Sequence, residues 1–195
     1  MRTNFTAKKS LVLSKFRKFS TETTTTTTAD EKYSTAMQVM HWAVAGSIIT
    51  CVGLVNYAQL YKGKKKMEIM YYHKSFGLLA AALVGPFIAL RFGSKIPAPV
   101  AGSSLEVMAA KAGHIALYAF MTFMPITGIA MGYYGGKGLP FFTTTIPGAE
   151  KADGDIAKQA FKLHSNIGHY AQYFIPLHVG AVGFHYFALG KNILP

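Results

Sequence analysis

Residues 163–187 have the sequence LHSNIGHYAQYFIPLHVGAVGFHYF, and this stretch decides the fold. It holds four histidines among apolar and small residues, and it contains no charged residue of the Asp, Glu, Lys or Arg type. His164 and His178 are 14 residues apart. On one helix the rotation between them is about 40° short of four full turns, so they face nearly the same way, and they lie about 21 Å apart along the axis. One helix would therefore present a histidine near each face of a membrane.

Three further apolar stretches precede this one. The four stretches span roughly residues 36–61, 70–90, 113–134 and 164–189. Each is close to the 20 residues that cross a bilayer as a helix, and none contains an acidic residue. The sequence therefore predicts an all-α integral membrane protein, an up-down-up-down four-helix bundle. The third connection ends in an amphipathic run, residues 155–161, which either lies on the membrane surface or extends the fourth helix.

Two histidines in the earlier stretches complete the pattern. His41 begins the first helix and His73 the second, so alternating helices place His73 level with His164 and His41 level with His178. Two histidines on facing helices, with no carboxylate or thiolate beside them, suit the axial ligation of a haem iron better than a zinc site. The sequence predicts two b-type haems with bis-histidine ligation by these four residues, which favours electron transfer over oxygen binding.

The other histidines have less specific positions. His169 lies about 140° around the helix from His164 and is expected to be structural. His185 shares a face with His178, and His114, at the start of the third helix, falls at the same side of the membrane. We interpret His185 and His114 as candidates for proton handling at a quinone, with ordinary hydrogen bonding as the alternative.

The charge of the chain is concentrated in its first residues. The formal net charge is +12, yet six of the twenty basic residues precede the first acid, Glu22, so a nucleic-acid partner is not indicated. Residues 1–32 are basic at first and rich in Ser and Thr, and we interpret them as a transit peptide, with a processing site at residues 17–20, followed by a Thr-rich spacer. The predicted location is the mitochondrial inner membrane, with residues 33–195 as the di-haem domain. The single cysteine, Cys51, permits neither a disulfide within the chain nor a CxxCH attachment, so any haem is non-covalent.

Four segments carry a resemblance to a known family. They are YSTAMQVMHW at residues 33–42, YYHKSFG at 71–77, AGHIALYAFMTFMPITGIAMGY at 112–133, and the stretch at 163–187 quoted above. With these motifs the chain resembles the bacterial-type cytochrome b561 family, which shares a domain with the cytochrome b subunits of nickel-iron hydrogenases. The resemblance covers residues 33–195 and implies His41, His73, His164 and His178 as the haem ligands; His114, Pro125 and His185 also match common family positions.

One position departs from the family pattern. Similar members carry two arginines late in the second helix, whereas this chain has Arg91 alone and Phe87 at the other place. The resemblance implies that Arg91 binds the haem, through a propionate, and that the second contact comes from elsewhere or is missing.

The resemblance implies electron exchange with the ubiquinone pool, and in one branch of the family with superoxide as the electron donor. The alternative is a haem-bearing anchor subunit of a larger respiratory complex. Expected partners are the lipid bilayer and a quinone or redox protein, and both a homodimer and association with a respiratory complex stay open. A transporter is disfavoured because the helices lack paired acidic residues. Orientation is open as well: the connections at the His73 side hold more basic residues than those at the other side, but imported proteins need not follow the positive-inside rule.

Overall fold

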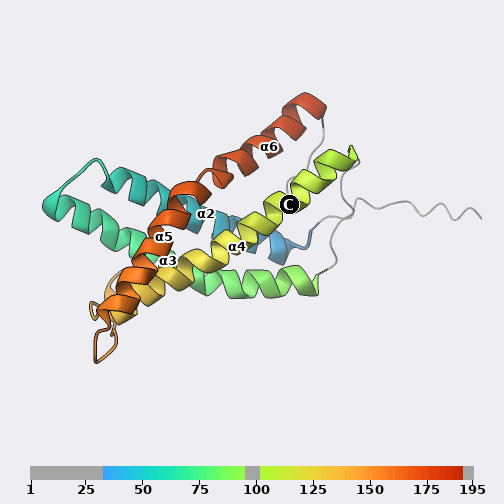
Figure 1. Cartoon of the computed structure of the whole chain (residues 1–195). Helices are drawn as coiled ribbons and strands as arrows, with labels where there is room; N and C mark the ends of the chain where they lie inside the picture. The colour runs from blue at the N-terminus through green and yellow to red at the C-terminus, as the bar shows by residue number, and fades with distance from the viewer. Residues whose placement is uncertain (1–32, 95–101, 191–195) are drawn as a thin grey trace, which may run out of the picture. The chain divides into compact units, whose positions relative to one another are not determined.

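The computed structural model describes residues 33–94 and 102–190, and this part of the chain forms helices and one small hairpin (Figure 1). The helices are α2 (Thr35–Ala58), α3 (Gly63–Gly93), α4 (Ser104–Tyr134), α5 (Gly154–Ala171) and α6 (Phe174–Leu189), and the strands are β1 (Leu139–Phe141) and β2 (Thr144–Ile146). The helix α2 packs against α3, and α5 packs along α4. The candidate transit peptide, its processing site and the Thr-rich spacer lie outside the described residues.

Helices α2, α3 and α4 are each long and apolar enough to cross a membrane, with 24, 31 and 31 residues. They contain the first three predicted stretches, but α3 and α4 begin earlier than expected. The Lys64 to Lys66 run, predicted to be a connection, forms the first turns of α3, because hydropathy marks the membrane core and not the helix end. Helix α4 begins after Ser103, whose Oγ accepts from the backbone N–H of Glu106 while the Glu106 carboxylate accepts from the N–H of Ser103.

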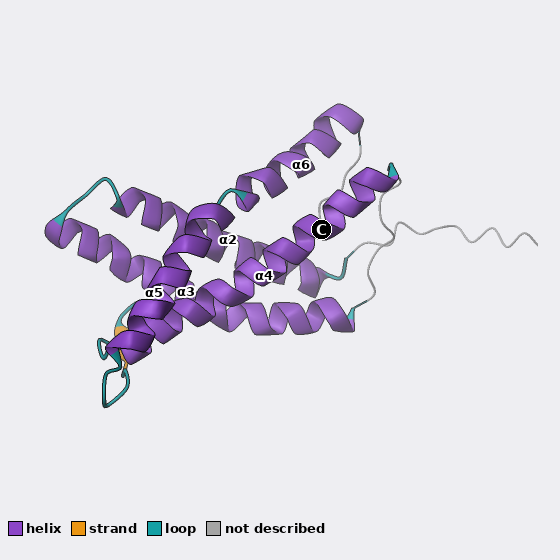
Figure 2. Cartoon of the chain, in the orientation of Figure 1, coloured by secondary structure: helices purple, strands orange, loops and turns teal. Residues whose placement is uncertain are grey.

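The fourth crossing differs from the prediction of one continuous helix over residues 164–189. It consists of α5 and α6, which are separated by Gln172 and Tyr173 (Figure 2). Pro176 explains the interruption, because proline has no N–H to bond the carbonyl of Gln172 and its ring crowds that carbonyl. Helix α5 also includes the amphipathic run at 155–161, so the extension is the correct alternative of the two. The all-α four-helix membrane bundle is confirmed, with a fourth member made of two successive helices.

The third connection contains an antiparallel hairpin that the sequence analysis did not predict. Strands β1 and β2 pair with Leu139 opposite Ile146, and the hairpin docks on α3. Ser75 is fully buried there, and its Oγ accepts from the backbone N–H of Phe142 at 3.0 Å. The hydroxyl of Tyr71 donates to the carbonyl of Phe142 at 2.7 Å. Two polar side chains of α3 therefore satisfy both backbone groups of Phe142, which would otherwise be costly to bury.

The buried core lies between α2 and α3, beside His41. Its buried members are Met37, Val44, Val84 and Phe87. Many other large apolar side chains point outward, including Trp42, Phe123 and Phe187, at 56%, 55% and 85% exposure. Apolar side chains on the outside of long helices suit contact with lipid, so the described surface agrees with a position in the bilayer.

Candidate functional site

His73 of α3 and His164 of α5 face each other. Their ring centroids are 6.2 Å apart and their planes meet at 85°. A bond between a metal and an imidazole nitrogen is about 2 Å long, so two histidines that share one metal have ring centres about 6 Å apart. The observed separation therefore fits axial ligation of one iron by this pair. It also agrees with the prediction that the two histidines lie at the same depth in the membrane.

The outer nitrogen of His73 is held by α2. Its Nδ1 lies 2.9 Å from the carbonyl oxygen of Cys51, and the Cys51 thiol donates to the carbonyl of His73 at 3.1 Å. Because a carbonyl oxygen only accepts, Nδ1 carries the hydrogen and Nε2 keeps a free lone pair. This is the arrangement of a metal-binding histidine, whose second nitrogen donates to a carbonyl or carboxylate.

The outer nitrogen of His164 is held by α4 in the same way. Its Nδ1 lies 3.1 Å from the carbonyl of Met124 and 3.0 Å from the hydroxyl oxygen of Thr127. Gly128 leaves room for this ring, because a Cβ there would lie 3.2 Å from Cε1 of His164. Because Nδ1 of His164 donates to a carbonyl, His164 also keeps Nε2 free. Sequence reasoning missed Cys51, Met124, Thr127 and Gly128 as neighbours of the site, since nothing in a single sequence distinguishes them from other helix-packing residues.

The second group of histidines gathers at the other end of the helices. The rings of His114 and His178 are 5.7 Å apart between centroids, with planes at 73°. His41 lies close enough to His178 and His114 for electrostatic interaction, and its ring is 6.4 Å from that of Phe87. The structure thus brings His41 and His178 to the same end of the bundle, as predicted, but the histidine ring paired with His178 is that of His114.

Arg91 belongs to this second group. Its Nε donates to the hydroxyl of Tyr118 at 2.9 Å, and its guanidinium carbon lies 5.7 Å from the ring centre of Tyr33. The Tyr118 ring in turn stacks on that of His114 at 6.5 Å. Phe87, at the place of the missing arginine, is buried between His41 and Tyr118. Tyr118 is a member of the group that sequence reasoning missed, and only its position one turn after His114 could have indicated it.

The rings of His185 and His169 contact aromatic neighbours and not the histidines of either pair among the described residues. Nδ1 of His185 is buried and has no hydrogen-bond partner among the described residues. His169 is exposed, and its ring contacts those of Tyr170 and Tyr173. His169 therefore points elsewhere than His164, as expected, and His185 holds a ring nitrogen available to a ligand.

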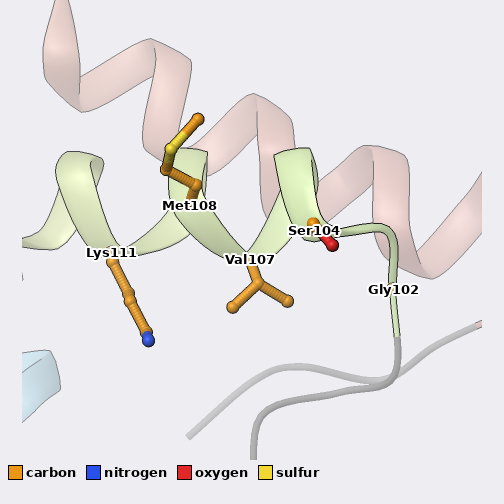
Figure 3. Close-up of a pocket in the computed structure, with 5 residues that line it drawn as sticks. All are labelled: Gly102, Ser104, Val107, Met108 and Lys111. Atoms are coloured by element: carbon orange, nitrogen blue, oxygen red, sulfur yellow. The ribbon is translucent and has the colours of Figure 1, made fainter.

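A shallow cavity of about 370 Å³ occurs at the beginning of α4. Its lining residues are Gly102, Ser104, Val107, Met108 and Lys111. Figure 3 shows Val107 and Lys111 on one side of the helix and Met108 pointing away from them. No histidine lines this cavity, so it is separate from the two groups described above.

Comparison with known proteins gives a family and a relative. The family model described as prokaryotic cytochrome b561 matches residues 32–195. A curated protein of Yersinia pestis, "Probable superoxide oxidase CybB", is 28% identical over 169 residues, which cover 84% of this chain and 94% of the relative. The family match extends over all the histidines of the two groups.

The comparisons correct the predicted location. The family is prokaryotic and the relative is bacterial, so the mitochondrial inner membrane and the transit peptide are wrong, and a bacterial inner membrane is indicated. The prediction rested on the basic, hydroxyl-rich composition of residues 1–32 and on the processing site expected at residues 17–20. Basic residues ahead of a first membrane helix also occur where they orient that helix, so a basic, acid-free beginning does not distinguish an import signal from an orientation signal.

The family match also gives the coarse function. It covers the whole described part of the chain, including the helices that cross the membrane and both histidine groups. The protein is a multi-pass membrane protein that carries b-type haem and transfers electrons. The chain belongs to the prokaryotic cytochrome b561 family.

Proposed function

We propose that the chain binds two b-type haems, each between two histidines, and passes electrons between them and the ubiquinone pool. His73 and His164 would hold one haem, and His41 and His178 the other. The observation that carries this proposal is the His73–His164 pair, with ring centres 6.2 Å apart and both outer nitrogens bonded to backbone carbonyls. That geometry leaves two Nε2 atoms free to take one iron from opposite sides.

The proposal for the second haem site depends on where His41 and His178 lie in the bundle. His41 and His178 lie at the opposite end from His73 and His164, and no hydrogen bond among the described residues engages their ring nitrogens. His114 stays beside His178 in this proposal and is not a ligand. When bound, a bis-histidine haem takes up and releases one electron without an open position on the iron.

Arg91 supplies positive charge at the same end. A haem carries two propionates, and arginine binds carboxylates through its planar fork of N–H groups. Arg91 uses Nε on Tyr118, which orients the guanidinium and leaves its terminal nitrogens for an anion. We propose that Arg91 binds a propionate of the haem held by His41 and His178. Buried Phe87 replaces the second charged contact by apolar packing against His41.

The electron donor is proposed from the relative, whose printed name is that of a superoxide oxidase. Two superoxide anions would each give up one electron and leave as dioxygen. One ubiquinone would take up these two electrons and two protons to become the quinol. An imidazole can supply protons near neutral pH, and we propose His185, assisted by His114, for this role. The support is the unpartnered, buried Nδ1 of His185 and the position of His114 beside His178.

Replacing His185 by alanine tests the quinone role. We expect both haem spectra to be unchanged and electron transfer to a soluble quinone to slow by roughly tenfold or more, because a positioned proton donor is lost. His114→Ala should slow it less. The measurement is stopped-flow reoxidation of the dithionite-reduced protein by a quinone analogue, normalised to haem content. His169→Ala is the matched control, since His169 is an exposed histidine on α5. Equal rates in all the variants and the parent would remove His185 and His114 from the reaction.

A further inference from the structure

Thr127 is one of the few buried polar residues of the described chain, with 8% of its surface exposed. Its Oγ1 lies 2.9 Å from the carbonyl of Phe123, 3.1 Å from the carbonyl of Met124 and 3.0 Å from Nδ1 of His164. A hydroxyl has one hydrogen, and both carbonyls only accept, so this hydrogen points to the backbone of α4. The lone pairs of Oγ1 are then directed at the N–H of His164.

The two proposed ligands of this haem therefore differ in how they are held. The Nδ1–H of His164 has two acceptors, the carbonyl of Met124 and the hydroxyl of Thr127. The Nδ1–H of His73 has the carbonyl of Cys51 alone. A hydrogen bond from the outer nitrogen raises the basicity of a metal-bound imidazole and fixes its orientation. The additional acceptor makes His164 the more strongly polarised ring.

Close packing of α4 and α5 keeps the ring at this hydroxyl. A Cβ at Gly128 would lie 3.2 Å from Cε1 and 3.5 Å from Nδ1 of His164. On the facing helix, a Cβ at Gly168 would lie 3.1 Å from Cε of Met124. The two glycines let the helices approach until the imidazole rests on the backbone of α4, so the ring has little freedom to turn away from Thr127.

We propose that Thr127 is a positioning residue that sets the midpoint potential of the haem held by His73 and His164. The hydroxyl accepts from Nδ1–H, orients the ring and makes Nε2 a stronger donor to the iron. A more basic ligand favours the oxidised iron and lowers the potential of that haem. This inference rests on the proposed role of His164 as a ligand.

The test is Thr127→Val, which keeps the branched shape and removes the hydroxyl. No donor is left unpaired, because Nδ1–H of His164 keeps the carbonyl of Met124. We expect the midpoint potential of one haem to rise, with a change in its reduction equilibrium of up to about tenfold, which is about 59 mV for one electron. Thr127→Ser retains the hydroxyl and should restore the parent potential. Thr122→Val is the matched control, since Thr122 Oγ1 donates to the carbonyl of Tyr118 on the same helix at 2.8 Å without touching a histidine.

A second readout uses the haem-free protein. The ¹⁵N resonance of Nδ1 of His164 should shift in Thr127→Val and not in Thr122→Val. If that resonance shifts while both haem potentials stay at the parent values, the contact exists but does not set a haem potential, which overturns the proposal, whereas the ligand role of His164 is decided separately by the haem content of His164→Ala. If neither changes, the proposal fails and the ligand role is untouched. A shift in potential in Thr127→Ser as large as in Thr127→Val would likewise overturn it.

Discussion

Replacing either His73 or His164 by alanine is expected to remove one and the same b-type haem and leave the other. The reason is the facing geometry of the two rings, 6.2 Å apart, with each outer nitrogen anchored on a neighbouring helix. Loss of either ring removes one of the two axial ligands proposed for that haem and so weakens its binding without touching the other site. Haem content and the reduced-minus-oxidised spectrum of the two purified variants should therefore be the same, with about half the parent haem.

His169→Ala is the control for this pair. His169 lies on α5 five residues after His164, but it is exposed and its ring contacts Tyr170 and Tyr173. The His169→Ala variant should keep both haems. If His73→Ala and His164→Ala instead lost spectrally different haems, the two residues would belong to different sites and the pairing would be wrong.

His41→Ala and His178→Ala are expected to remove the other haem, whereas His114→Ala should retain both. This experiment distinguishes two partners for His178. The ring of His114 is the nearer neighbour in the structure, at 5.7 Å between centroids, while spacing along the helices pairs His178 with His41. His114 also stacks on Tyr118, which bonds Arg91, so its surroundings suit a role beside the haem rather than on the iron.

The measurement is again haem content with the difference spectrum. Arg91→Lys, measured in the same way, keeps the positive charge but not the planar fork, so it tests whether that fork contributes to holding the haem. The opposite result is informative. Loss of the second haem in His114→Ala, with full haem content in His41→Ala, would make His114 the ligand and exclude the His41–His178 pair.

The membrane helices could be predicted because their signal is hydropathy over 20 residues, which needs no knowledge of packing. The pairing by depth of His73 with His164 followed from helix alternation and the rise per residue. The lengths of the apolar stretches and the spacing of the histidines are enough to place His73 and His164 at one end of the bundle, and His41 and His178 at the other, where the structure has them.

The remaining features depend on contacts that one sequence does not display. Pro176 divides the fourth crossing after Ala171, while α3 and α4 continue through Pro86 and Pro125, so proline alone does not locate a break. The hairpin beside α3 depends on buried Ser75, and the anchoring of His164 depends on Thr127. Each is a single polar side chain whose partner is distant in sequence.

The measurement that tests the central claim most directly is the ratio of haem to protein. Pyridine extraction of the purified protein identifies the haem type, and amino-acid analysis gives the protein concentration. Two groups of histidines at opposite ends of the helices predict two b-type haems per chain. A ratio of one, or no haem at all, would contradict the proposal that His41, His73, His164 and His178 form two sites.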